Sequence, residues 1–128
     1  MSSNRIIHSD DAPKAVGPYS QAVLSGGVLY ASGQIGLDPQ AGKLVAGDVE
    51  SQALQITKNL SAVLAAAGAS LSDIVKVNIF LTDMADFPLV NAIYASWLGE
   101  HRPARATVAV AALPLGAVVE MDLIASID

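Results

Sequence analysis

Residues 74–81 read IVKVNIFL, and this stretch decides the fold because it predicts a strand set between two helices. Lys76 and Asn78 fall on one side of the two-residue alternation, whereas Val77 and Ile79 fall on the other. Branched and aromatic side chains dominate the segment, as is typical of strands. We therefore expect a β-strand that spans the whole stretch.

The segments on either side have the period of a helix. Between residues 49 and 67, apolar residues recur every three or four positions, and Asp48 and Gly68 are a fitting N-cap and a fitting stop. A second helix is predicted from about residue 86 to about residue 99, with a proline tolerated in its first turn. The strand is therefore preceded and followed by a helix.

The N-terminal part predicts a β-hairpin. Ser20–Ser25 and Val28–Ser32 flank Gly26-Gly27, a pair of residues typical of the tight turn that joins two antiparallel strands. A short extended piece, residues 6–8, precedes the hairpin. This part of the chain should therefore form antiparallel strands.

The expected element order is hairpin, helix, strand, helix, strand, strand, and the last two strands carry Arg105 and Glu120. Helices that link strands of one sheet make right-handed crossovers, so each helix is expected to join parallel neighbouring strands. Both helices then cover the same face of one mixed sheet. We predict a single α/β (α+β) domain over residues 1–128, whose other sheet face requires a subunit partner to cover it.

The composition indicates an oligomer and argues against a nucleic-acid partner. Hydrophobic residues make up 52% of the 128 residues and charged residues only 15%. Large subunit interfaces explain such a share, because obligate interfaces are apolar like a core. Seven Lys and Arg stand against twelve Asp and Glu, giving a net charge of −5, so no surface for a phosphate backbone is expected.

Other classes of site and location are also disfavoured. The chain has no cysteine, which excludes disulfides, thiolate metal sites and cysteine nucleophiles. His8 and His101 lack the spacing of metal ligands, so no metal is expected. No signal-peptide pattern is visible, and the longest apolar run, residues 108–119, is too short to span a bilayer. We expect a soluble cytoplasmic protein with no membrane partner.

Two charged side chains interrupt the last two strands. Arg105 lies in PARATVAV (103–110) and Glu120 lies in VVEMDLI (118–124). Charged groups are rarely buried without a partner, because leaving water is costly. One interpretation is an Arg at a strand edge and a Glu facing solvent. The other is a pocket in which the Arg binds a carboxylate through paired hydrogen bonds and the Glu polarises a water. The residues alone leave both open.

Three further positions are weaker candidates. Tyr19 follows Gly17-Pro18 on a loop, where its ring either lines a cleft or packs on the sheet. Gly33, within Ser32-Gly33-Gln34, either exposes its backbone to an anion or is a simple bulge. Asn91 either faces a pocket or lies on the helix surface. Aromatic residues expected in the core are Phe80, Tyr94 and Trp97.

Five short motifs then occur in order along nearly the whole chain: GPYSQA (17–22), ASGQI (31–35), DIVK (73–76), VNAIY (90–94) and PAR (103–105). Together they resemble the Rid family of reactive intermediate and imine deaminases, also called the YjgF family. The resemblance implies a fold like that of the homotrimeric bacterial chorismate mutases, with two helices on one face of a mixed sheet. Three sheets would form a barrel-like core with a cleft at each subunit interface.

The resemblance also implies an activity. Similar family members hydrolyse 2-imino or enamine acids, such as 2-iminobutanoate and 2-iminopropanoate, to 2-oxo acids and ammonia, without a cofactor. The implied roles are carboxylate binding for Arg105 and water positioning for Glu120, whose ionised form the Arg105 charge would favour. Tyr19 and Ser32 match the pocket tyrosine and serine, and Gly33 matches a backbone contact near the ligand.

Three more positions are implied by the same resemblance. Phe87 and Asn91 match positions near the cleft, and Phe87 is expected to reach the site of the neighbouring subunit. Thr107 matches a substrate-binding position at which many close members carry a cysteine. If the position acts only through its backbone or shape, deamination is retained, and if a thiol shapes specificity, the substrate range differs. The thiol is lost, whereas the backbone groups and a small polar side chain remain.

A rival interpretation from another class is a non-catalytic trimer that binds small carboxylic acids as a metabolite sensor. It predicts binding that depends on Arg105 but no turnover. Some family members are also described as endoribonucleases or translation inhibitors, and the acidic composition argues against that role here.

Overall fold

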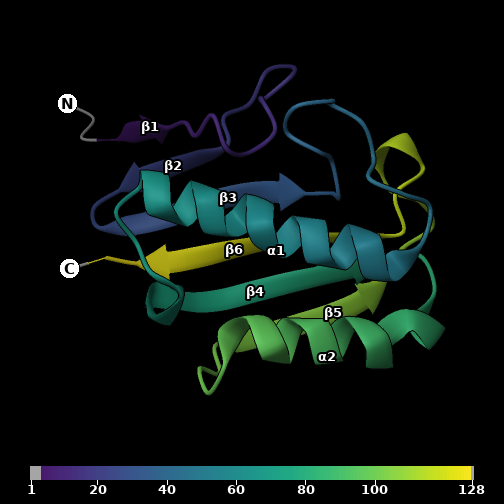
Figure 1. Ribbon diagram of the computed structural model, residues 1–128. Helices are drawn as coiled ribbons and strands as arrows, with labels where there is room; N and C mark the ends of the chain where they lie inside the picture. Colours follow the sequence, from purple (N-terminus) through teal and green to yellow (C-terminus); the bar gives the residue numbers. More distant parts are fainter. Residues whose placement is uncertain (1–3, 128) are drawn as a thin grey trace.

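One six-stranded sheet organises the chain, for which the computed structural model describes residues 4–127 (Figure 1). The predicted hairpin is confirmed, since β2 and β3 pair antiparallel across Gly26-Gly27, both of which have positive φ. The strand predicted over residues 74–81 is confirmed as β4, with the predicted bounds. The strands are β1 (Arg5–Ile7), β2 (Ala22–Ser25), β3 (Val28–Gln34), β4 (Ile74–Leu81), β5 (Ala104–Ala109) and β6 (Val119–Ser126).

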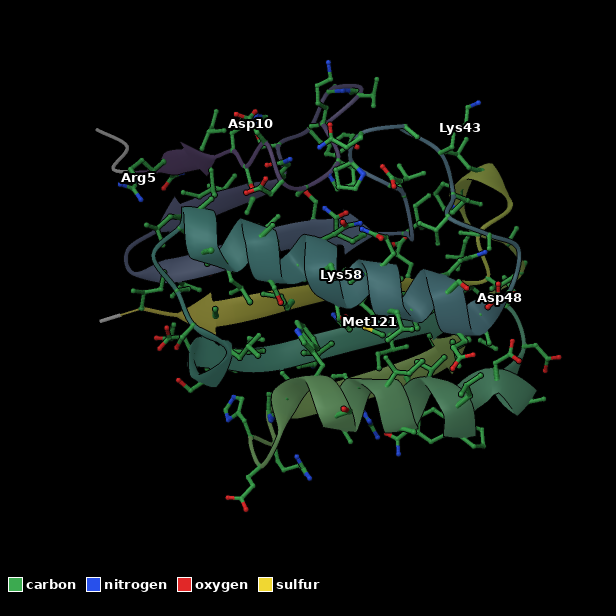
Figure 2. The ribbon with its side chains drawn as sticks, in the orientation of Figure 1. Arg5, Asp10, Lys43, Asp48, Lys58 and Met121 are labelled. Carbon is green, nitrogen blue, oxygen red and sulfur yellow. The ribbon has the colours of Figure 1, made fainter. Side chains whose placement is uncertain are left out.

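Both predicted helices are present, as α1 (Val49–Ala66) and α2 (Phe87–Leu98). The Asp48 side chain caps α1 by accepting a hydrogen bond from the Ser51 N–H at 2.9 Å, and Asp48 lies at the start of the helix in Figure 2. Both helices lie on the same face of the sheet, as expected (Figure 1). Beneath them is the apolar core, which includes Ile56, Leu60, Val77, Met121 and Leu123.

The strand order is β1-β2-β3-β6-β4-β5, and it corrects one expectation. α2 joins β4 and β5 as parallel neighbours, as predicted. The strands joined by α1, β3 and β4, are not neighbours, because β6 lies between them and pairs antiparallel with both. The side chains that β6 buries are Val119, Met121, Leu123 and Ala125. This apolar row faces the helices.

The approach of α1 to the sheet depends on Gly36. A Cβ added at this residue would lie 2.7 Å from the Gln52 Cα and 2.9 Å from its carbonyl oxygen. Gln52 itself is fully buried, and its side chain joins two loops to the helix. Its Nε2 donates to the Ala46 carbonyl at 2.8 Å, and its Oε1 accepts from the Val118 N–H at 2.9 Å. The glycine therefore fixes where the helix rests, and Gln52 anchors the start of β6.

The other face of the sheet has no helix on it in the described chain. The strand register places Glu120, Phe80 and Val108 in one row across this open face, and Tyr30 opposite Ile124 in another. Tyr30 and Val108 are exposed. The open face therefore combines apolar side chains with the Glu120 carboxylate.

Candidate functional site

Arg105 is held by three residues of α2. It lies on the edge strand β5, and its guanidinium donates to the Asn91 Oδ1 at 2.6 Å. The same group lies 5.3 Å from the ring centroid of Phe87 and 5.1 Å from that of Tyr94. These distances are within the range of cation–π attraction. The helix therefore sets the position of the arginine, because its first, second and third turns each supply a contact.

A cavity of about 460 Å³ opens beside this arginine. Its lining includes Asn91, Tyr94, Arg102 and Arg105, so it is strongly cationic. Within the part of the chain that the structure describes, the buried hydroxyl of Tyr94 has no hydrogen-bond partner, and neither has that of Thr107. Burial raises the pKa of Tyr94, so its hydroxyl stays protonated and able to donate. A cavity of this kind suits a small anion.

Glu120 lies at a second, larger cavity of about 570 Å³, whose walls also include Tyr19 and Gly33. A Cβ on Gly33 would lie 2.5 Å from the Glu120 Oε2, so only a residue without a side chain allows this position of the carboxylate. β3 ends at Gln34, and the ladder between β3 and β6 shifts register between Ala31 and Gln34. This irregularity brings the backbone of Gly33 against the carboxylate.

The loop that carries Tyr19 is fixed by a buried glutamine. The Oε1 of Gln21 accepts from the Ser9 N–H at 2.6 Å, and its Nε2 donates to the carbonyls of Ser9 and Pro13 at 3.0 and 2.8 Å. The Ser32 hydroxyl donates to the Ser20 carbonyl at 2.6 Å and so ties the loop to β3. Ser32 does not line the cavity, and its contact in the structure is with this loop.

The electrostatics around Glu120 differ from the expectation. Burial, together with the nearby Asp122 carboxylate, raises the pKa of Glu120 above its ordinary value. The expected influence of Arg105 is absent within residues 4–127, because the two residues lie on opposite faces of the sheet. Arg105 is in register with the buried Val77, whereas Glu120 is in register with Phe80 on the open face.

The predicted site residues thus form two groups in one chain. One group, Arg105, Thr107, Phe87 and Asn91, belongs to β5 and α2, and the other, Glu120, Tyr19, Ser32 and Gly33, belongs to β6, β3 and the loop before β2. The structure brings Arg105 together with Phe87 and Asn91, and Glu120 together with Tyr19 and Gly33, but it does not join the two groups. A site that uses both needs residues from two subunits.

Sequence reasoning missed several residues that line these cavities, among them Tyr94, Lys14 and Leu115. Tyr94 was assigned only to the core, where it is 5% exposed, yet its ring also contacts Arg105. Its spacing from Phe87 and Asn91, which places the three residues on one helix face, could have indicated this contact. Lys14 and Leu115 line the cavity at Glu120, and no pattern in the sequence indicated either of them.

Two absences apply to residues 4–127 of the structure. Among these residues, no group of three or more His, Asp and Glu side chains is arranged to hold a metal ion. No helix in this part of the chain has both the length and the apolar character needed to cross a membrane.

Comparison with known proteins identifies the family. A model of the family described as "Endoribonuclease L-PSP" matches residues 9–127, which is nearly the whole chain. The chain belongs to this family. It is the Rid (YjgF) family indicated by the five motifs, so that prediction is confirmed.

Relatives cover the Rid chain almost from end to end. A human protein named 2-iminobutanoate/2-iminopropanoate deaminase is 46% identical over 121 residues, which cover 94% of this chain and 88% of the human one. A solved Rid-family protein from Yersinia pestis superposes with a TM-score of 0.96 at 47% identity, covering 98% of this chain and all of that one. E. coli TdcF with bound serine superposes with a TM-score of 0.92 at 40% identity, covering 97% and 99%. The predicted fold class is confirmed by these structures.

Proposed function

We propose that this protein hydrolyses 2-imino acids, of the 2-iminobutanoate and 2-iminopropanoate type, to 2-oxo acids and ammonia. The observation that carries the proposal is the identity over nearly the whole chain with a human deaminase of that name. The chain offers the two groups this reaction needs. Arg105 is a fixed cation for the substrate carboxylate, and Glu120 is a carboxylate at a cavity that can hold water.

We infer that the active form is a homotrimer and that each site forms between two subunits. Arg105 and Glu120 lie on opposite faces of the sheet, so one chain cannot direct both at one small substrate. The open face carries exposed apolar side chains that a second subunit would cover, since exposed apolar patches mark interaction surfaces. The α2 side of one subunit would then meet the Glu120 cavity of the next, with Phe87 reaching the neighbour's site.

The reaction proceeds through addition of water and loss of ammonia. An enamine substrate first takes a proton at carbon to become the imine. Arg105 binds the carboxylate and so orients C2 of the imine. Glu120 accepts a proton from water as the water oxygen bonds to C2, and protonation of the nitrogen gives a tetrahedral amino alcohol. A second proton then converts the amino group to ammonium, the C–N bond breaks, ammonia leaves with the bonding pair, and the hydroxyl loses its proton to become the keto oxygen. No cofactor takes part.

The remaining site residues assist this chemistry. Tyr19 lines the cavity at Glu120 and would contact the substrate, and the Gly33 backbone would contact it near the carboxylate. Asn91 and Phe87 hold the arginine, and Thr107 would contact the bound anion from β5. Ser32 would act on the pocket through the loop that it ties down. We place the activity in the cytoplasm, which cell fractionation would test.

The proposal is tested with an imine that a second enzyme generates in the assay. A dehydratase acting on threonine releases 2-iminobutanoate, and a trapping amine competes with hydrolysis for it. Wild-type protein should accelerate formation of 2-oxobutanoate and reduce the trapped fraction. Equal product formation with and without protein would contradict the proposal, and binding of 2-oxobutanoate without turnover would instead support a non-catalytic carboxylate binder.

Gly33→Ala should lower activity with little effect on stability. The new Cβ would lie 2.5 Å from the Glu120 Oε2, and the flexible carboxylate, rather than the backbone, would move away. Misplacing a catalytic group by about 1 Å can cost on the order of 100-fold in rate. We expect kcat/KM for 2-iminobutanoate to fall by at least about tenfold while Tm stays near that of wild type. An unchanged kcat/KM would mean that this position of Glu120 is not the active one.

Asp122→Asn should move the acidic side of the pH–rate profile to lower pH. Catalysis requires ionised Glu120, so activity falls as the pH drops through the pKa of Glu120. The Asp122 charge raises that pKa, and removing the charge lowers it, which keeps the base ionised at lower pH. The amide can still accept the hydrogen bond that Asn78 donates to Asp122 at 2.8 Å. A profile of kcat/KM against pH that does not move would show that another group controls this side.

A further inference from the structure

We propose that Leu115, together with Val16, forms an apolar wall that selects the side chain of the substrate. On this reading the protein prefers 2-imino acids with branched or long apolar side chains over short or acidic ones. The inference rests on the proposed function, because it assigns a substrate class to the same site.

The first observation is the backbone of Leu115. Its φ of 59° and ψ of 22° make it the one non-glycine residue with positive φ among residues 4–127. A residue with a Cβ rarely adopts this conformation, and such strain is concentrated at functional sites. The side chain is also 71% exposed, so burial in the core does not compensate for the strain.

The second observation is where this strained residue lies. Leu115 and Pro114 line the cavity that contains Glu120, from the loop that immediately precedes β6. Val16, which is 81% exposed, lines the same cavity from the loop that carries Tyr19. Two exposed apolar side chains from distant parts of the sequence therefore line one cavity beside the proposed water-binding carboxylate.

The geometry of the reaction places the side chain of the substrate against this wall. The substrate carboxylate is bound by Arg105 of the adjacent subunit, and C2 must lie at the water held by Glu120. The third substituent of C2 is the side chain, and the space left for it is lined by apolar groups that also include Ile35 and Leu37. At about 30 Å³ per water-sized group, the seven heavy atoms of 2-iminobutanoate fill about 210 Å³. The cavity of about 570 Å³ has room for a larger side chain.

One charged group at the cavity argues for a different preference and must be tested. Lys14 also lines it, and its ammonium could pair with an acidic substrate side chain. It is a single exposed lysine on a long flexible stem, whereas Leu115 is fixed by its backbone. We therefore assign the selection to the apolar wall.

The test compares three imines, which amino-acid oxidases generate in the assay from leucine, alanine and glutamate. In each assay a trapping amine competes with hydrolysis for the imine. Wild type should favour the leucine-derived imine over the alanine-derived one by at least about tenfold, since a single added methylene in an apolar pocket already contributes about that much and the leucine side chain has more than one. Leu115→Ala should reduce this ratio several-fold, and Leu115→Lys should raise turnover of the glutamate-derived imine. Leu54→Ala, at an exposed leucine of α1 away from the cavity, is the matched control and should not change the ratio.

Equal turnover of all three imines by wild type, or a ratio that Leu115→Ala leaves unchanged, would overturn the inference. Calorimetry with the corresponding 2-oxo acids separates this inference from the proposed function. Tighter binding of 4-methyl-2-oxopentanoate than of pyruvate, lost in Leu115→Ala, would support the wall even if no imine were hydrolysed. Equal Kd values for the two acids would contradict the wall even if imines were hydrolysed.

Discussion

Arg105→Met and Glu120→Gln should each yield a folded protein that has lost most of its imine hydrolysis. Removing the arginine abolishes a charge-assisted clamp worth about 2–4 kcal/mol, which corresponds to roughly 30- to 1,000-fold in kcat/KM. Removing the general base should cost about 100-fold or more, down to the uncatalysed rate. Both substitutions keep similar side-chain volumes, so Tm should change little. The measurement is the trapping assay with 2-iminobutanoate.

Mixing these two inactive variants should restore activity. If each site takes Arg105 from one subunit and Glu120 from the next, a randomly exchanged trimer has both wild-type groups at about a quarter of its sites. The mixture, after mild dissociation and reassembly, should therefore recover about a quarter of wild-type activity. Arg5→Met, at an exposed arginine of β1, is the control and should keep full activity alone. No recovery in reassembled mixtures would contradict a site shared between subunits.

Of the substitutions predicted here, Gly36→Ala should lower the free energy of unfolding the most. The added methyl carbon would lie 2.7 Å from the Cα of Gln52, and backbone cannot move aside as a flexible side chain can. Overpacking of this kind costs about 1–3 kcal/mol, and loss of the two Gln52 hydrogen bonds adds about 1 kcal/mol each. The total approaches the lower end of the usual free energy of unfolding, about 5 kcal/mol, so much of the protein should be unfolded at 37 °C.

Gly47→Ala is the matched control for this prediction. Nothing lies within 4 Å of a Cβ at Gly47, and its φ is not positive, so alanine is tolerated there. Urea unfolding followed by the fluorescence of Trp97, at one fixed protein concentration, should separate the two variants clearly. Equal midpoints for Gly36→Ala and wild type would mean that α1 can shift away from the sheet at little cost.

The local elements could be predicted because their signals are local. Alternation in residues 74–81, the cap at Asp48 and the turn at Gly26-Gly27 each act within a few residues, and all three predictions are confirmed. The insertion of β6 between β3 and β4 could not be predicted, since strand order depends on pairing between residues far apart in the sequence. The crossover rule gives the direction of a linked strand but leaves open how many strands are skipped.

At the candidate site, too, features within one strand could be predicted, whereas the pairing between strands could not. The alternation of residues placed Arg105 and Glu120 on definite faces of their own strands. It did not say which faces coincide, because that depends on the register of β5 and β6 against β4. The two residues prove to lie on opposite faces. The raised pKa of Glu120 has the same origin, since it reflects burial and Asp122 rather than the expected arginine.

The contacts that α2 makes with Arg105 have a consequence for the affinity of substrate. A free arginine side chain loses about 1.5–2 kcal/mol of rotamer entropy when it is fixed in one conformation. In this chain Asn91, Phe87 and Tyr94 already restrict the guanidinium before any anion arrives. That entropy is lost during folding, when core burial compensates for it, and not at each encounter with substrate. At this magnitude, preorganisation strengthens binding of a small carboxylate by about tenfold.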